Sequence, residues 1–289
     1  MMSDRLIRGT ALNGKVRAIA ADTRELVQEL HRRHGTLAVA SAALGRTATM
    51  GAIMGAMMKG SDRLTIQVKG DGPIGKIVVD ANANGEVRGY VDHPQIELPL
   101  KPNGKLDVAA AVGEGFIYVV KDLGLKEPYR GSTPIVSGEI AEDFTYYFAK
   151  SEQTPSAVAL GVLVDVDYSI RAAGGFLIQL LPGLSDEDIS EIEAQLARLK
   201  PVTSMLDEGM RPESILKEIL PDFTLLGESA VIHRCTCSKE RVEQTLVSLG
   251  RDELAAMIRE DGQAEVSCHF CNERYHFARE ELESLAANL

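Results

Sequence analysis

The feature that most constrains this 289-residue chain is the placement of its four cysteines. None occurs before residue 235, and two short pairs then follow, Cys235-x-Cys237 in "HRCTCSKE" and Cys268-x-x-Cys271 in "SCHFCNERY". Two such pairs brought together offer four thiolates in a tetrahedron, which is the arrangement of closed structural zinc sites. Soft sulfur ligands favour zinc over magnesium or calcium. The sequence therefore predicts one zinc ion per chain, bound by these four cysteines.

Zinc at this position has two possible roles. It can fold a module of about sixty residues that is too small to be very stable by itself. It can also hold every thiol of the chain as a thiolate, so that each pair can close a disulfide once the metal leaves. His233 and His269 lie near enough to be considered as ligands, but the four cysteines already complete the shell. Spacing alone leaves both roles open.

The charge of the chain limits its partners. A formal net charge of -11 argues against nucleic acid and anionic lipid. Residues 231–289 are acidic too, with seven Lys and Arg against eleven Asp and Glu, a balance of -4. The N-terminal "MMSDRLIRGTALNG" lacks the continuous apolar stretch of a secretory signal. We therefore expect a cytoplasmic protein that binds neither nucleic acid nor membrane.

The longest weakly polar stretch runs from Leu37 to Met58. It is about long enough to cross a bilayer, but it is rich in Ala, Gly, Ser and Thr and carries Arg46 near its middle. This composition favours a helix packed inside a soluble domain.

Residues 1–182 mix strand and helix patterns. In "DRLTIQVKG" Leu64, Ile66 and Val68 alternate with polar residues, and "GKIVVDANANGEVRGYV" gives two strand-like runs around an Asn-Gly turn. Further strand candidates are "GFIYVVKDL", "SAVALGVLVDV" and "GGFLIQLLPG", and "GEIAEDFTYYFAKSEQTPS" indicates a helix that ends before Pro155. The sequence predicts the α+β class, with an N-terminal α/β core domain over residues 1–182 and a mainly antiparallel sheet.

The composition changes after residue 182. Ser185 opens a capping box, and four apolar residues follow at spacings of three and four: Ile189, Ile192, Leu196 and Leu199. A second helix begins at Arg211-Pro212 and ends before Pro221. We expect residues 183–230 to form a helical linker that packs its apolar stripes on something else. Residues 231–289 then form the small C-terminal zinc-binding module.

A glycine-rich segment, "GDGPIGKI", offers two weak nucleotide motifs. Gly70, Gly72 and Gly75 have dinucleotide-fingerprint spacing, and Gly75-Lys76 resembles the end of a phosphate loop. The magnesium-binding hydroxyl of such a loop is replaced by Ile77, and the residues that follow favour a strand where both motifs need a helix. We expect a strand-to-strand turn and no bound nucleotide.

No set of residues with a catalytic pattern is apparent. Glu139, Glu142, Asp143 and Glu152 fall on one predicted helix, where acidic runs usually face solvent. Neither a nucleophile elbow nor a His-Glu-x-x-His pair accompanies the six histidines. We expect a protein that is not an enzyme.

Three long segments carry a resemblance to a known family: "GDGPIGKIVVDANANGEVRGYV", "EPYRGSTPIVSGEIAEDFTYYFAKSEQTPSAVALGVLV" and "AAGGFLIQLLPG". Together with the spacing of the cysteines, they make the chain similar to the heat shock protein 33 family, the redox-regulated holdase chaperones also called 33 kDa chaperonins. The resemblance runs nearly end to end. It implies an α/β core, a helical linker and a C-terminal zinc module.

The resemblance also implies an activity and its control. Such a chaperone needs no ATP and is inactive while reduced and zinc-bound. Oxidation of Cys235, Cys237, Cys268 and Cys271 forms two disulfides, expels the zinc and unfolds the C-terminal part. The surface exposed in this way holds unfolding client proteins and prevents their aggregation. The resemblance further implies a homodimer in the active state.

We expect the disulfides to join Cys235 to Cys237 and Cys268 to Cys271. Neighbours in sequence stay close in an unfolded chain, whereas cross-pairing closes a loop of about thirty residues. Two alternatives remain. A thiol-disulfide oxidoreductase would use Cys268 and Cys271 at the start of a helix. A constitutive zinc adaptor for nucleic acid would need basic residues around the cysteines.

Overall fold

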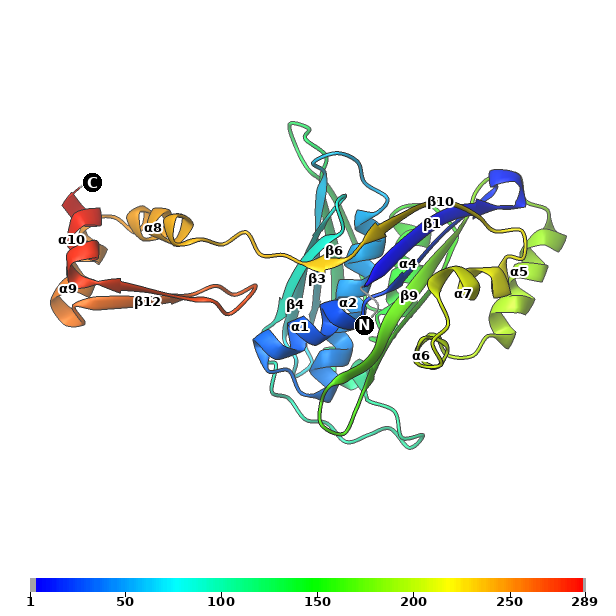
Figure 1. Cartoon of the computed structure of the whole chain (residues 1–289), viewed down its shortest axis with the longest axis horizontal. Coiled ribbons are helices and arrows are strands. Elements are labelled where there is room, and N and C mark those ends of the chain that lie inside the picture. Colours follow the sequence, from blue (N-terminus) through cyan, green and yellow to red (C-terminus); the bar gives the residue numbers. More distant parts are fainter. Residues whose placement is uncertain (1–3, 288–289) are drawn as a thin grey trace. The chain divides into compact units, whose positions relative to one another are not determined.

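The computed structural model describes residues 4–287 of the chain. It contains two compact units, one ending at Arg234 and the other beginning at Cys235. Each unit has its own sheet structure (Figure 1). Each also has its own hydrophobic core.

The first unit contains two sheets. The five-stranded sheet has the order β10-β1-β2-β9-β8 and consists of β1 (Arg5–Ala11), β2 (Val16–Asp22), β8 (Ser156–Val164), β9 (Ile170–Leu180) and β10 (Thr224–Ala230). The six-stranded sheet has the order β11-β5-β4-β3-β6-β7 and consists of β3 (Arg63–Gly70), β4 (Lys76–Asn82), β5 (Glu86–Val91), β6 (Gly115–Asp122), β7 (Tyr129–Pro134) and β11 (Ile232–His233). Pairing is antiparallel except between β11 and β5. The predicted α+β class with mainly antiparallel sheet is confirmed.

Helix α2 (Ala38–Gly55) lies between the two sheets and packs against strands of both (Figure 1). Its small residues allow this close approach. A Cβ atom on Gly51 would lie 2.7 Å from Val79 Cγ1, and one on Gly55 would lie 2.6 Å from the Asn82 carbonyl oxygen. The weakly polar stretch is therefore a core helix, as its composition predicts. None of the described helices combines the length and hydropathy that crossing a bilayer requires.

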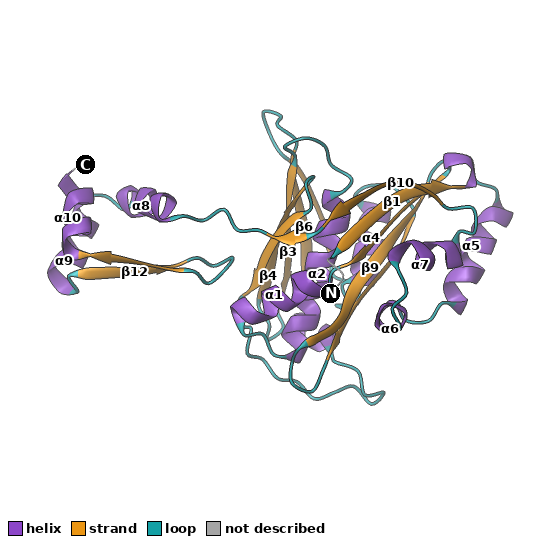
Figure 2. Ribbon diagram, in the orientation of Figure 1, coloured by secondary structure: helices purple, strands orange, loops and turns teal. Residues whose placement is uncertain are grey.

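This part of the first unit also contains four shorter elements: the turn η1 (Leu12–Gly14) and helices α1 (Arg24–His34), α3 (Val108–Val112) and α4 (Ala141–Lys150). Helices and strands of the unit are distinguished in Figure 2. The strand and helix patterns of the sequence are confirmed at β3, β4, β5, β6, β8, β9 and α4. The glycine-rich segment joins β3 to β4 as a turn, so the strand-to-strand prediction is also confirmed.

Three helices cover the opposite face of the five-stranded sheet: α5 (Asp186–Arg198), α6 (Val202–Asp207) and α7 (Pro212–Ile219). Strand β2 is buried on both faces, with Ile19 in the core that contains α2 and Ala18 in the cluster beneath α5–α7. The Ser185 hydroxyl accepts the Asp188 N–H at 3.1 Å, which confirms the predicted start of α5. In this conformation residues 183–230 fold as part of the first unit. The division into a core domain (1–182), a helical linker (183–230) and a C-terminal module (231–289) stays a prediction.

The second unit is small. It contains α8 (Lys239–Ser248), α9 (Arg251–Glu260), the hairpin of β12 (Gln263–Ser267) and β13 (Arg274–Ala278), and α10 (Arg279–Ala287). Its core is formed by six buried residues: Val242, Leu246, Leu254, Ala264, Phe277 and Leu282. So small a core leaves little hydrophobic stabilisation to hold the unit together.

Candidate metal centre

The four cysteines approach one another in the second unit. Cys235 and Cys237 lie in the segment before α8, and Cys268 and Cys271 lie in the loop between β12 and β13. All four Sγ atoms lie within 4.8 Å of one another. The Sγ atoms of Cys235 and Cys268 are 3.7 Å apart, and those of Cys237 and Cys271 are 3.3 Å apart.

These distances fit a tetrahedral metal. Four sulfurs bound to zinc at about 2.3 Å lie about 3.8 Å from one another. The spacing found here is therefore close to that of a zinc tetrathiolate, and the donor set is the soft one that zinc prefers. The four cysteines could hold a zinc ion without rearrangement of the chain.

The Cys-x-x-Cys loop is shaped by its backbone. The Cys268 N–H donates to the Glu273 carbonyl at 2.9 Å, and the Asn272 N–H donates back to the Cys268 carbonyl at 2.8 Å. Asn272 has a positive φ of 56°, a conformation that Asn tolerates better than most residues. This tight turn brings Cys268 and Cys271 together on one side of the loop.

The environment of the loop affects the two thiols. Burial raises the pKa of the Cys268 thiol and, to a larger extent, that of the Cys271 thiol. A thiol that stays protonated is a poor nucleophile and a poor ligand. A bound divalent cation reverses this effect because its charge stabilises the thiolate form. Metal binding and thiol reactivity are therefore linked at this site.

No histidine belongs to the cluster. Within residues 4–287, the four cysteines are the one group of three or more His, Cys, Asp or Glu side chains close enough to share a metal ion. His233 ends β11 in the first unit, and His269 lies between the two cysteines of the loop. Neither joins the four sulfurs, so the candidate donor set consists of the four cysteines alone.

Tyr275 is a contact that the sequence analysis did not predict. Its hydroxyl donates a hydrogen bond to Cys237 Sγ at 3.2 Å. Tyr275 lies on β13, and the short strands of the second unit were not recognised in the sequence. A possible signal was the alternation of Tyr275 with Phe277, which places both rings on one face of a strand.

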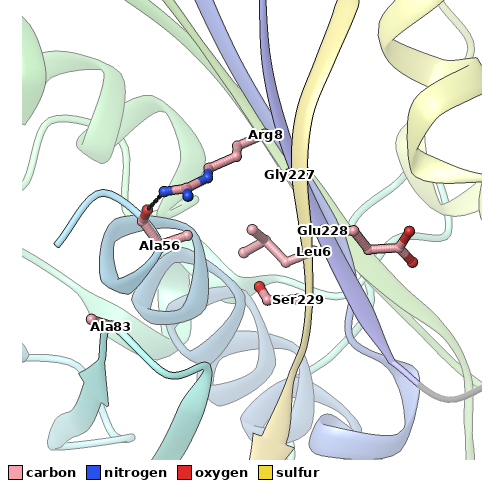
Figure 3. A pocket seen from close by; sticks show the side chains of 7 residues that line it. All are labelled: Leu6, Arg8, Ala56, Ala83, Gly227, Glu228 and Ser229. Carbon is pink, nitrogen blue, oxygen red and sulfur yellow. Dashed lines mark hydrogen bonds between the residues drawn. The ribbon is translucent and has the colours of Figure 1, made fainter. Parts of the chain in front are cut away.

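A small hollow in the first unit does not offer a second site. It measures about 100 Å³ and is lined by Leu6, Arg8, Ala56, Ala83, Gly227, Glu228 and Ser229 (Figure 3). The Arg8 guanidinium donates to the Ala56 carbonyl at 3.5 Å. Pockets for drug-sized ligands measure roughly 300–1,000 Å³, so this hollow is too small for a nucleotide.

Comparison with known proteins agrees with the fold and the cysteine cluster. A family model described as "Hsp33 protein" matches residues 4–278. The "33 kDa chaperonin" of Oceanobacillus iheyensis is 54% identical over 287 residues, covering 98% of this chain and 99% of the relative. The "33 kDa chaperonin" of Bacillus subtilis strain 168 is 53% identical over 284 residues, covering 98% of each.

A solved structure is also similar. The crystal structure of the 33 kDa chaperonin (heat shock protein 33 homolog) from Thermotoga maritima matches with a TM-score of 0.94 and 39% sequence identity, covering 99% of both chains. Both the sequence and the architecture therefore agree over nearly the whole length. This chain belongs to the Hsp33 family.

Proposed function

We propose that this chain is a redox-regulated, ATP-independent holdase chaperone. It is inactive when reduced and zinc-bound; oxidation forms two disulfides, releases zinc and lets it bind unfolding proteins. The observation that carries the proposal is the convergence of every cysteine of the chain into one cluster with tetrahedral spacing. Membership of a family whose relatives are named chaperonins supports it.

The chemistry of the switch belongs to the thiolates. When bound, zinc keeps the four sulfurs deprotonated at neutral pH. A thiolate sulfur attacks one oxygen of a peroxide, the O–O bond breaks and hydroxide leaves, so the sulfur becomes a sulfenic acid. The neighbouring thiolate then displaces hydroxide from that sulfur and forms the S–S bond. Each disulfide removes two electrons from its pair, so two peroxide molecules oxidise all four cysteines.

We assign the disulfides to Cys235–Cys237 and Cys268–Cys271. Each of the two sulfur–sulfur distances given above joins a cysteine of one pair to a cysteine of the other pair. In a tetrahedral site, however, all six sulfur–sulfur distances are similar. The ligand geometry therefore does not select a pairing. Once the chain loosens, pairs that are close in sequence form at the lowest cost in loop entropy.

Loss of the metal destabilises the second unit. Structural zinc contributes about 10–16 kcal/mol of apparent binding free energy in small modules, while whole domains are stable by about 5–15 kcal/mol. The six-residue core of this unit cannot replace that contribution. Oxidation therefore removes the ligands and the fold of the unit together.

Client proteins are held by apolar surface. In the described conformation Ile192 of α5 is buried, and Leu196 and Leu199 are partly buried in the same cluster on the five-stranded sheet. We assign client binding to this helical layer and to the sheet face beneath it, both of which become available if the layer loosens. The family resemblance supports a homodimeric active form and a cytoplasmic location.

The geometry disfavours the two alternatives. An oxidoreductase of the thioredoxin type needs its first cysteine at the start of a helix. Cys268 instead lies between two strands. A nucleic-acid adaptor needs basic residues, whereas residues 231–289 carry seven Lys and Arg against eleven Asp and Glu.

The test uses one preparation in two redox states. Zinc content, disulfide mapping by mass spectrometry and light scattering of a heat-denaturing client are measured before and after peroxide treatment at raised temperature, without ATP. We expect one zinc per reduced chain, and after oxidation free zinc, two local disulfides and suppressed aggregation. The matched control replaces all four cysteines with Ser and should bind no zinc and show no response to peroxide. If zinc leaves and both disulfides form but the client aggregates as before, the site is purely structural.

A further inference from the structure

Tyr275 connects the hydrophobic core of the second unit to the cysteine cluster. Its ring packs against the cluster that contains Phe277 and Leu282, and it pairs across the hairpin with Val266. Its hydroxyl reaches Cys237 Sγ at 3.2 Å. The ring is thus fixed by apolar packing while its polar end lies against one ligand sulfur.

The loop that carries Cys268 and Cys271 is fixed by backbone hydrogen bonds, whereas Cys237 is contacted by a side chain. The N–H groups of Cys271 and Asn272 donate to the Cys268 carbonyl at 3.3 and 2.8 Å. These donors belong to the turn itself and are present whatever the side chains are. The donor to Cys237 is a side chain, so this contact can be changed by a single substitution.

We propose that Tyr275 is a positioning residue that holds Cys237 and slows its oxidation. The proposal rests on the redox function proposed above. A hydroxyl that donates to a thiolate withdraws electron density from the sulfur lone pairs, and these are the electrons that attack peroxide. Tyr275 thereby sets how much oxidant is needed before the Cys235–Cys237 pair reacts.

The affected step is the first one at this pair. The Cys237 thiolate sulfur forms a bond to one peroxide oxygen, the O–O bond breaks, and hydroxide leaves, so that the sulfur becomes a sulfenic acid. Cys235 then displaces hydroxide from the oxidised sulfur to complete the disulfide. Attack by Cys237 weakens its hydrogen bond from Tyr275, so the bond stabilises the reduced state more than the transition state.

The experiment compares Tyr275→Phe with Tyr118→Phe, which removes a hydroxyl from an exposed tyrosine of β6 in the first unit. Both full-length proteins are loaded with zinc, and peroxide-driven zinc release is followed with a chromophoric chelator. We expect an equal zinc content in both variants and release about three- to tenfold faster in Tyr275→Phe, because the hydrogen bond to the thiolate is only partly weakened at the transition state. Release from Tyr118→Phe should match the unsubstituted protein.

A second measurement separates positioning from general loosening. The reduced, zinc-loaded proteins are alkylated for short times, and each cysteine is quantified by mass spectrometry. We expect faster labelling of Cys237 in Tyr275→Phe and unchanged labelling of Cys268. Equal acceleration at all four cysteines, or zinc release at the unsubstituted rate, overturns the inference while leaving the proposed function intact. Absence of zinc from the unsubstituted protein would instead contradict the proposed function.

Discussion

At the scale of single residues, Asp143 has a buried position that the sequence pattern could not predict. Its position among four acidic residues predicts a solvent-facing helix, which is wrong for this side chain because it is only 1% exposed. Its carboxylate accepts the N–H groups of Val136, Ser137, Gly138 and Ile140 at 2.8–3.3 Å. Helical spacing cannot reveal which acid turns back onto the preceding loop, because that contact depends on the path of the loop.

We predict that Asp143→Ala lowers the free energy of unfolding by about 3 kcal/mol or more. The substitution leaves several backbone donors without their acceptor, and each buried, unpaired donor costs about 1–3 kcal/mol. Urea denaturation measures the change. Glu142→Ala, which alters the exposed neighbour, is the control and should stay within about 0.5 kcal/mol of the unsubstituted protein. A similar small effect of Asp143→Ala would mean that the loop does not depend on this carboxylate.

Asp4 gives a prediction about pH. Its carboxylate is buried and accepts the N–H groups of Glu25 and Leu26 at the start of α1. Burial raises the pKa of Asp4 to about 7, against a usual value near 3.9. The folded state therefore binds the proton more tightly than the unfolded state. The stability that this contributes is fully present below about pH 4 and is lost as pH rises through about 7.

Asp4→Asn should remove this pH dependence, because an amide oxygen can accept the same N–H groups without ionising. We expect the free energy of unfolding to fall between about pH 4 and pH 7 more steeply in the unsubstituted protein, by up to about 1.4 kcal/mol per pH unit. Urea titrations of both proteins across this range give the difference, in which the other titrating groups cancel. Parallel pH profiles would show that Asp4 titrates normally.

At the scale of elements, the sequence predicted strands well where one face meets the core and the other meets water. Strand β3 alternates clearly and was found. Strand β2 is buried on both faces, so "VRAIAAD" shows no alternation. Strand β10 lies at the edge of its sheet, with a bulge where Leu226 falls between the residues paired to Arg8 and Gly9. Both strands were missed because they have neither the period-two pattern of β3 nor the long apolar run that marks β9, which is also buried on both faces.

A substitution in helix α7 tests whether the helical layer formed by α5–α7 unfolds cooperatively with the first unit. Leu216 is fully buried in the cluster on the five-stranded sheet. Leu216→Ala should cost about 2–5 kcal/mol, the usual range for a buried leucine, and should shift the unfolding midpoint of the whole first unit. Glu218→Ala, on the exposed side of the same helix, should change it little. A midpoint for the first unit that does not move in Leu216→Ala would place α7 outside its cooperative fold.

At the scale of the whole molecule, the sequence predicted that the four cysteines come together, because each pair is close in the chain and both pairs lie in one short segment. The sequence could not indicate that residues 183–230 fold with the first unit. Their apolar pattern shows which face of each helix is buried, but not which part of the chain that face packs against. The structure supplies the partner, because the face of the five-stranded sheet that contains Phe176 and Ile178 is covered by α5–α7. Buried apolar surface is thus unevenly divided: the first unit has two extensive hydrophobic clusters, and the second has one cluster of six buried residues besides the four cysteines.

This division predicts the order in which the molecule opens. Treatment of the reduced protein with a zinc chelator at room temperature should unfold the second unit and leave the first intact, because the proposed zinc site lies in the second unit. Limited proteolysis should then cut within residues 235–289 and spare α5–α7, whose apolar faces stay covered by the sheet. Raising the temperature should add cuts within residues 183–230 before any in residues 4–182, because transient opening of the helical layer costs less free energy than unfolding of the whole first unit.

The controls decide what such cuts mean. The protein with all four cysteines changed to Ser should show the same early cuts without chelator, since it cannot hold the metal. Leu216→Ala should bring the cuts in residues 183–230 to a lower temperature, because it weakens the layer directly. Early cuts in residues 4–182 would contradict the proposed order, because the core would then depend on the metal despite having its own hydrophobic clusters. Protection of residues 235–289 after zinc removal would show that the second unit folds without metal, and oxidation would then need another route to the active state.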